Sequence, residues 1–106
     1  MITISFTKNA EGIYNGFTTN GHAGYADSGY DIVCASVSVL IINTINSIEM
    51  FTSDQINLVG GDVTSKIEFL ILSEVSNETT LLLNSLILGL KSIIEEYGQE
   101  YIDLKV

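Results

Sequence analysis

The sequence predicts a single α+β domain, with two helices packed on a mostly antiparallel or mixed sheet. The chain has 106 residues, which is a common length for one domain. Short segments that alternate apolar and polar residues lie at both ends and in the middle. Two longer segments with helical apolar spacing separate them. We therefore expect the element order β-β-α-β-β-α-β over residues 1–106.

The first two strands are expected to form a hairpin. Ile2, Ile4 and Phe6 alternate with polar residues, which is the period of a half-buried strand. The run 9–12 reads Asn-Ala-Glu-Gly and is typical of a turn. A second strand over Ile13–Thr19 would pair with the first.

The first helix is expected over Ile32–Phe51. The preceding segment 20–31 is rich in glycine and short polar residues, and the chain then becomes apolar almost all round. The length of this apolar segment favours a buried helix over a strand. Asp31 or Ser28 would cap its amino terminus. A helix that begins near Asp31 places Cys34 in its first turn, where the helix dipole favours a thiolate.

The second half of the chain repeats the pattern. Strands over Ile56–Val59 and Val63–Leu72 flank the glycine pair 60–61, which is a hairpin signal. Ser76 or Asn77 can cap a second helix, whose apolar stripe runs to Tyr97. The remaining expected features are a helix-terminating glycine at Gly98 and a closing strand over Tyr101–Val106.

The charge makes nucleic acid an improbable direct partner. The chain has 13 acidic residues and only four basic ones, for a formal net charge of −9. The four are lysines scattered along the chain, whereas phosphate backbones are held by clustered basic residues. An acidic surface attracts basic proteins or peptides by long-range steering, although plain solubility explains the same charge.

Cysteine usage and hydropathy suggest a cytoplasmic protein. The single cysteine allows no intramolecular disulfide, and the first residues do not resemble a signal peptide. The longest apolar run, Ile32–Ile42, is about half the length of a membrane helix, so we expect no membrane partner. The positive mean hydropathy then indicates a heavily buried core together with an apolar face for a second copy of the chain.

One histidine and one cysteine, His22 and Cys34, are twelve positions apart. An imidazole close to a thiol can take its proton and turn it into a nucleophile. Taken alone, however, a cysteine in an apolar run is more often inert packing, and a histidine in a polar loop is more often solvated. Asp27 and Asp31 could orient His22, or simply solvate the loop and cap the helix.

The residues do not predict a metal or a cofactor. A structural zinc site usually takes four Cys or His ligands, and this chain contains two such residues in total. The glycines at 21, 24 and 29 lack the spacing and the lysine of a phosphate-binding loop.

Two short runs carry a specific resemblance. Gly21-His22-Ala23 and the run 29–38, which reads Gly-Tyr-Asp-Ile-Val-Cys-Ala-Ser-Val-Ser, resemble the ribosomal-processing cysteine protease (Prp) family. Chain length, the opening hairpin, the second glycine hairpin and the acidic end of the second helix are also similar.

The resemblance implies a cysteine endopeptidase that removes the short N-terminal extension of large-subunit ribosomal protein twenty-seven during ribosome maturation. It places the nucleophile on Cys34 and the general base on His22. Asp31, Ser38, Gly21 and Gly29 fall on shared positions of the motif and are supporting candidates whose roles stay open. It also implies a homodimer and a basic ribosomal protein as substrate.

Two other readings stay open at this point. In the first, the chain is a non-catalytic homodimeric module that binds a ribosomal or assembly protein, with Cys34 in its core. In the second, the same pair of residues serves another peptidase or an acyl hydrolase with an unrelated substrate.

Overall fold

The structure of the chain is a computed structural model that describes residues 1–21, 28–60 and 66–106, and for residues 28–31 the backbone alone. The element order confirms the predicted β-β-α-β-β-α-β arrangement. The elements are β1 (Ile2–Lys8), β2 (Tyr14–Asn20), α1 (Ser28–Phe51), β3 (Ile56–Gly60), β4 (Ile67–Ile71), α2 (Asn77–Tyr97) and β5 (Ile102–Lys105).

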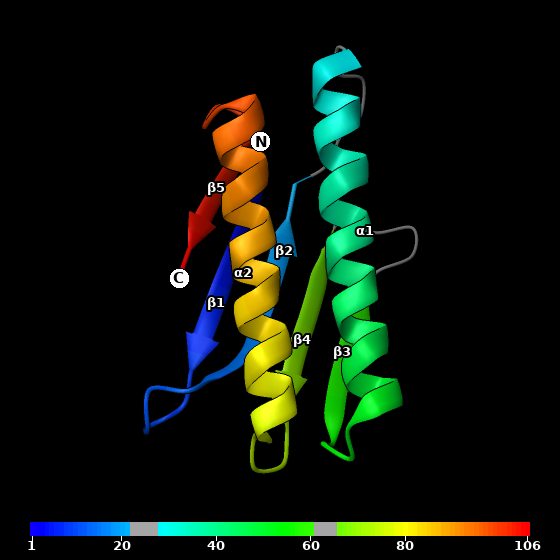
Figure 1. Cartoon of the computed structure of the whole chain (residues 1–106), viewed down its shortest axis with the longest axis vertical. Helices are drawn as coiled ribbons and strands as arrows, with labels where there is room; N and C mark the ends of the chain where they lie inside the picture. Colours follow the sequence, from blue (N-terminus) through cyan, green and yellow to red (C-terminus); the bar gives the residue numbers. More distant parts are fainter. Residues whose placement is uncertain (22–27, 61–65) are drawn as a thin grey trace.

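The strands form one mixed sheet in the order β3-β4-β2-β1-β5. Three of its pairings are antiparallel, and β5 pairs with β1 in parallel. Both helices lie on the same face of the sheet, α1 over β3 and β4, and α2 over the half that contains β1 and β5 (Figure 1). The described part of the chain therefore forms two layers, and both of its helices lie on one face of the sheet.

Some expected strand boundaries need correction. The strand expected over Val63–Leu72 is observed over Ile67–Ile71, with residues 61–65 outside the described part of the chain. The closing strand is Ile102–Lys105, one residue shorter at each end than expected. Strand ends fray where the partner strand ends, so an apolar alternation alone overestimates their length.

The core lies between the sheet and the helices. On the sheet side, Ile4 is fully buried and Phe17 is 1% exposed. The Phe17 ring stacks on Phe69 of the neighbouring strand, with ring centroids 5.1 Å apart. The helices contribute apolar side chains at helical spacing: Val33, Val37, Ile41, Ile45 and Ile48 from α1, and Leu83, Leu86, Ile87 and Leu90 from α2.

The two helices approach closely at one point. A methyl group placed on Gly89 of α2 would lie 2.8 Å from Cδ1 of Leu40 in α1. A side chain at position 89 would therefore force the helices apart or displace Leu40. The missing side chain lets α1 and α2 pack side by side on the sheet.

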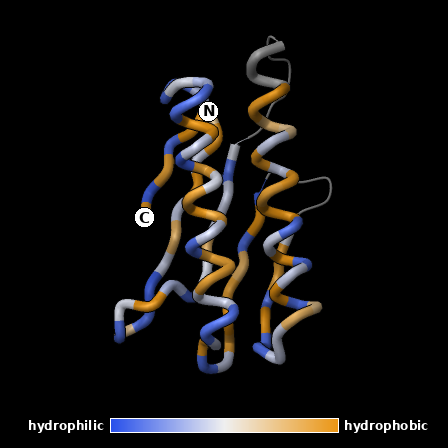
Figure 2. Tube along the Cα trace, in the orientation of Figure 1, coloured by the Kyte–Doolittle hydropathy of each residue, from blue (hydrophilic) through white to orange (hydrophobic). Residues whose placement is uncertain are grey.

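The outward side of α1 also carries apolar residues, and Figure 2 shows them, with some hydrophilic ones between, along the coloured part of this helix. The stretch Ile32–Phe51 has a mean hydropathy of 1.6, so it could cross a membrane by length and composition alone. The expectation that the chain has no membrane partner was based on the shorter apolar run Ile32–Ile42. The apolar stretch in the structure is longer and continues to Phe51. A third of the stretch is buried inside the domain, and core helices of soluble proteins pass the same test.

The ends of α2 confirm two predicted caps. The Ser76 side chain accepts a hydrogen bond from the Thr79 amide at 3.1 Å. Gly98 follows the last turn with φ +105°, and its amide donates to the Ile94 carbonyl at 2.8 Å. A residue with a side chain rarely adopts that φ, which explains the glycine.

Asp54, just after α1, holds the start of α2. Its Oδ2 atom accepts hydrogen bonds from the Ser76 amide at 3.0 Å and the Ser76 hydroxyl at 2.9 Å. Burial acts to raise the pKa of Asp54, but the hydrogen-bond donors on Thr79 and Ser76 outweigh it and lower that pKa below its ordinary value of 3.8. The carboxylate thus joins the α1–β3 connection to the amino terminus of α2.

We predict that Asp54→Asn lowers the free energy of unfolding by about 1–3 kcal/mol at pH 7, because a charged acceptor is lost from paired donors. The folded-state pKa is depressed, so the contribution is present above pH 3.8 and is lost as the pH falls through the folded-state value. Urea unfolding at several pH values measures this. As a control, Glu68→Gln removes an exposed carboxylate 3.7 Å from Lys66 and should change stability by less than about 0.5 kcal/mol. Equal losses in the two variants would contradict the role given to Asp54.

Two features require a glycine at position 21, directly after β2: the backbone conformation there and the close approach of Met1, which precedes β1. Its φ is +91°, and a Cβ atom there would overlap the carbonyl oxygen of Met1. Gly12, in the β1–β2 turn, has a similar φ of +79° but no atom within 4 Å of the same position. Substitutions at these two glycines can therefore distinguish the effect of backbone strain on stability from the effect of steric overlap.

We predict that Gly12→Ala costs about 1–2 kcal/mol of stability, from left-handed strain alone. Gly21→Ala should cost at least about 1 kcal/mol more, because the overlap with Met1 adds to the same strain. Thermal unfolding of the two variants side by side measures the difference. Equal losses of stability in the two variants would mean that the overlap with Met1 does not contribute to the effect of Gly21→Ala.

Candidate active site

Cys34 lies in the second turn of α1, not in the first turn as expected. The helix begins at Ser28, six positions earlier, and Asp31 falls inside its first turn instead of capping it. The amides of an α-helix are unpaired only in the first turn, and the dipole effect falls off over the same distance. The helix start therefore gives Cys34 less electrostatic help than the sequence suggested.

The thiol is half-buried. Cys34 packs against the edge of the hydrophobic core, next to Val33, which is fully buried. Consecutive residues of a helix point about 100° apart, so a completely buried Val33 fixes the direction of Cys34. This intermediate burial places Cys34 at the border of the core, between a core cysteine and an exposed nucleophile.

Ser38 lies one helical turn beyond Cys34 and is exposed. Residues four apart on a helix are neighbours on its surface, so the two side chains share one side of α1. The Ser38 hydroxyl therefore lies on the surface of α1 and not in the core. Ser36 instead bonds back to its own helix, since its hydroxyl donates to the Ile32 carbonyl at 2.9 Å.

The other proposed site residues are described only in part. His22 and Asp27 lie outside the described residues, and for Gly29 and Asp31 the helical backbone alone is described. Gly21 is described and precedes His22 directly. Figure 1 shows the end of β2 at the same end of the molecule as the start of α1. The fold therefore brings the beginning of the His22 segment and the Cys34 turn to one end of the domain.

Sequence reasoning did not identify the contact between Gly21 and Met1. This contact depends on the β1–β2 pairing, in which Thr3 lies opposite Asn20. In the sequence, the glycine at position 21 was the only sign of this close contact. Among residues 1–21, 28–60 and 66–106, no three His, Cys, Asp or Glu side chains are grouped so that they could hold a metal ion.

Such an arrangement is suited to nucleophilic chemistry. A half-buried thiol can become a thiolate when a base accepts its proton, and the thiolate is the reactive form. Because the helix dipole gives limited help at the second turn, a side-chain base becomes more important for Cys34.

Comparison with known proteins also indicates a cysteine nucleophile, and the similarity extends over nearly the whole chain. A model of the family described as cysteine protease Prp matches residues 1–103. Two Staphylococcus aureus proteins, from strains Mu50 and NCTC 8325, are named ribosomal processing cysteine protease Prp. Each is 30% identical to this chain over 99 residues, which is 93% of both chains.

Solved structures agree in fold. The chain is similar to a Staphylococcus aureus Prp in complex with a covalently linked product peptide, with a TM-score of 0.86 and 31% identity. A Prp complex with a substrate peptide gives 0.89 and 30%. Both alignments cover 99% of this chain and 98% of the other. This chain therefore belongs to the family of ribosomal processing cysteine proteases.

Proposed function

We propose that this protease removes the short N-terminal extension of large-subunit ribosomal protein twenty-seven during ribosome maturation. The observation that carries the proposal is the full-length match to relatives named for ribosomal processing. One such relative is described in complex with a substrate peptide, and in another complex the product peptide is covalently linked. A covalent link to the peptide is what a thiol nucleophile would produce.

In the proposed mechanism, His22 takes the proton of Cys34, and the thiolate attacks the scissile carbonyl of an extended peptide. The carbonyl π electrons move to oxygen, giving a tetrahedral oxyanion. The oxyanion then collapses, the C–N bond breaks, and His22 returns its proton to the leaving amine. Water hydrolyses the resulting thioester and regenerates the thiol.

The donors that hold the oxyanion have to lie closer to Cys34 than the free amides at the start of α1. The free amides of the first turn of α1 begin six residues before Cys34, and a helix rises about 1.5 Å per residue. The exposed hydroxyl of Ser38, on the same side of α1, is a nearer donor. Asp31 would act in this scheme as a first-turn carboxylate and not as the helix cap.

We further infer that the enzyme acts in the cytoplasm on a basic protein. The single cysteine allows no intramolecular disulfide, which suits a reducing compartment. The formal net charge of −9 would attract a basic ribosomal protein before the extension reaches the thiol.

A homodimer is also part of the proposal. Val39 and Leu88 are each 67% exposed, and they directly neighbour Leu40 and Gly89, the residues at the close contact between the helices. The two exposed side chains therefore lie at one level of the helix layer. Ile32, Ile42, Met50, Phe51 and Leu81 add to the exposed apolar surface of α1 and α2. Exposed apolar surface of this kind often marks an association site.

The decisive experiment is cleavage of the host's full-length ribosomal protein by the wild-type enzyme and by Cys34→Ala and His22→Ala. We expect each variant to lose at least about a thousandfold in kcat/KM, because a nucleophile and its base act as a unit. Mass spectrometry of the product locates the cut. Ser36→Ala is the matched control on the same helix and should retain activity, since its hydroxyl only bonds to the Ile32 carbonyl.

The alternatives give different results in this experiment. If the wild type binds the ribosomal protein but leaves it intact, the non-catalytic module replaces the protease reading for this chain. If it cleaves unrelated peptides as well as peptides from the extension, an unrelated substrate replaces the ribosomal one.

Steering by charge predicts a difference in salt sensitivity. Between about 0.05 M and 0.5 M NaCl, kcat/KM for the full-length basic substrate should fall about tenfold or more, because screening shortens the reach of the acidic surface. For a short neutral peptide that spans the cut, it should fall less than about twofold. Equal sensitivity of the two substrates would exclude steering.

The dimer prediction uses Val39→Lys combined with Leu88→Lys. If the outer helix surface joins two copies, the double variant should sediment as a monomer at concentrations where the wild type is a dimer. Leu72→Lys, a position 60% exposed just after β4, is the control and should stay dimeric. A wild type that is monomeric at about 0.1 mM would contradict the proposed association.

A further inference from the structure

β5 is an edge strand, and no other described strand pairs with its outer side. In the sheet order it has a single neighbour, β1. The Tyr101 carbonyl accepts a hydrogen bond from the Ile2 amide at 2.9 Å, so the backbone at Tyr101 faces β1. Backbone groups of successive strand residues face opposite edges, so those of Ile102 and Leu104 face outward. Such an edge is a template for one more strand.

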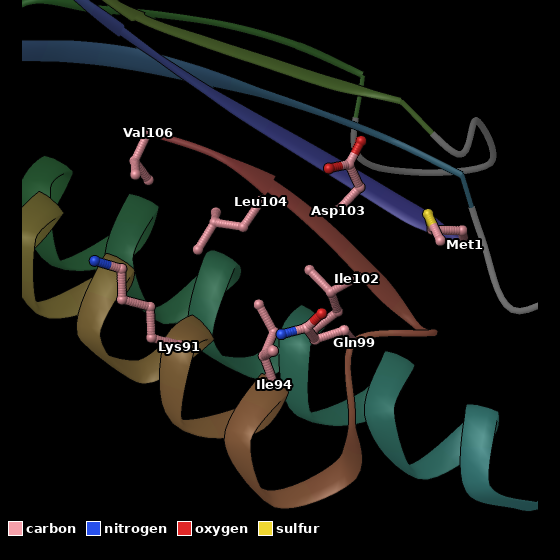
Figure 3. Close-up of a pocket in the computed structure, with 8 residues that line it drawn as sticks. All are labelled: Met1, Lys91, Ile94, Gln99, Ile102, Asp103, Leu104 and Val106. Atoms are coloured by element: carbon pink, nitrogen blue, oxygen red, sulfur yellow. The ribbon is translucent and has the colours of Figure 1, made fainter.

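A groove runs beside this edge, between β5 and the carboxyl-terminal half of α2. It has a volume of about 610 Å³. Ile102 and Leu104, the residues with outward-facing backbone groups, also line the groove, opposite Ile94. Figure 3 shows Lys91 and Ile94 extending from α2 toward the strand, and Asp103 pointing away from the helix. An added strand would therefore place every second side chain in the groove.

The positive charge of Lys91 indicates which peptide side chains the groove would accept. Lys91 is one of four basic residues in a chain with 13 acidic ones. Within the described ranges, the ion pairs are Lys66–Glu68 and Lys105–Asp103, and neither involves Lys91. Lys91 lines this groove together with the apolar residues Ile94 and Leu104. A carboxylate next to an apolar side chain would complement both features.

We propose that this groove binds an extended peptide segment by strand addition to β5. The segment has an apolar and an acidic residue two positions apart. The apolar side chain packs between Ile94 and Leu104, the carboxylate pairs with Lys91, and the peptide backbone bonds to the outward groups of Ile102 and Leu104. The groove is built from other residues than the Cys34 turn, so this binding goes beyond the proposed proteolysis.

Binding is tested on the full-length Cys34→Ala protein, which excludes cleavage of the probe. The probe is a fluorescein-labelled peptide, Thr-Val-Thr-Glu-Thr, whose valine and glutamate share one face of a strand. We expect saturable binding by fluorescence anisotropy, weakened at least about tenfold by Lys91→Glu. Lys66→Glu makes the same change in net charge on β4's side of the sheet and should alter the affinity less than about twofold. Equal weakening by both variants would overturn the proposal.

Amide hydrogen exchange tests the strand addition itself. The peptide should slow exchange at Ile102 and Leu104, whose amides face outward, and leave Asp103, whose amide faces β1, unchanged. Absence of this alternating protection, or equal affinity for a probe with N-methylated valine and glutamate, would overturn strand addition. Protection of the same two amides at high protein concentration without peptide would instead assign the edge to a second copy of the chain. Absence of binding to wild-type and variant proteins alike would overturn the proposal while leaving the cleavage experiment unaffected.

Discussion

The burial of one side of α1 determines the position of the thiol. Val33 and Ile48, near the two ends of the helix, are completely buried, and the residues between them at helical spacing are nearly so. Each buried aliphatic side chain stabilises the fold by roughly 1.5–3 kcal/mol, so the helix cannot rotate on the sheet without a large loss. The close contact of Leu40 with Gly89 fixes the lateral position of α1 against α2. Cys34 is therefore held at the border of the core by its neighbours.

The early start of α1 changes how such a thiol can be activated. Cys34 lies beyond the turn in which unpaired amides and the helix dipole act most strongly. The limited help from the helix start increases the need for a proton acceptor near Cys34, and His22 is the single histidine of the chain. Gly21, packed on Met1, anchors the backbone immediately before that histidine.

The sequence predicted the elements better than their arrangement. Ser76 and Gly98 were identifiable because capping chemistry is local, and both caps are observed. The parallel pairing of β1 with β5 was not predictable, because it joins the two ends of the chain and depends on how the helices cover the sheet. The start of α1 was placed too late because Gly29 is a poor helix former, at about 1 kcal/mol relative to alanine. The exposure of Cys34 follows from that helix's rotation, which a single apolar run does not specify.

The positive mean hydropathy has two structural sources with different consequences. The inner side of α1 supplies the core, and its outer side still exposes Val39, Met50 and Phe51. A helix that is apolar on all sides is normally covered on all sides. On the other face of the sheet, β1 and β2 present Thr3, Ser5 and Thr18, for which water is a sufficient partner. Leu58, Val59 and Leu70 of β3 and β4 are also exposed, but α1 and α2 carry more of the exposed apolar residues than the strands do, so a partner that covers the helix layer would bury the larger part of this surface.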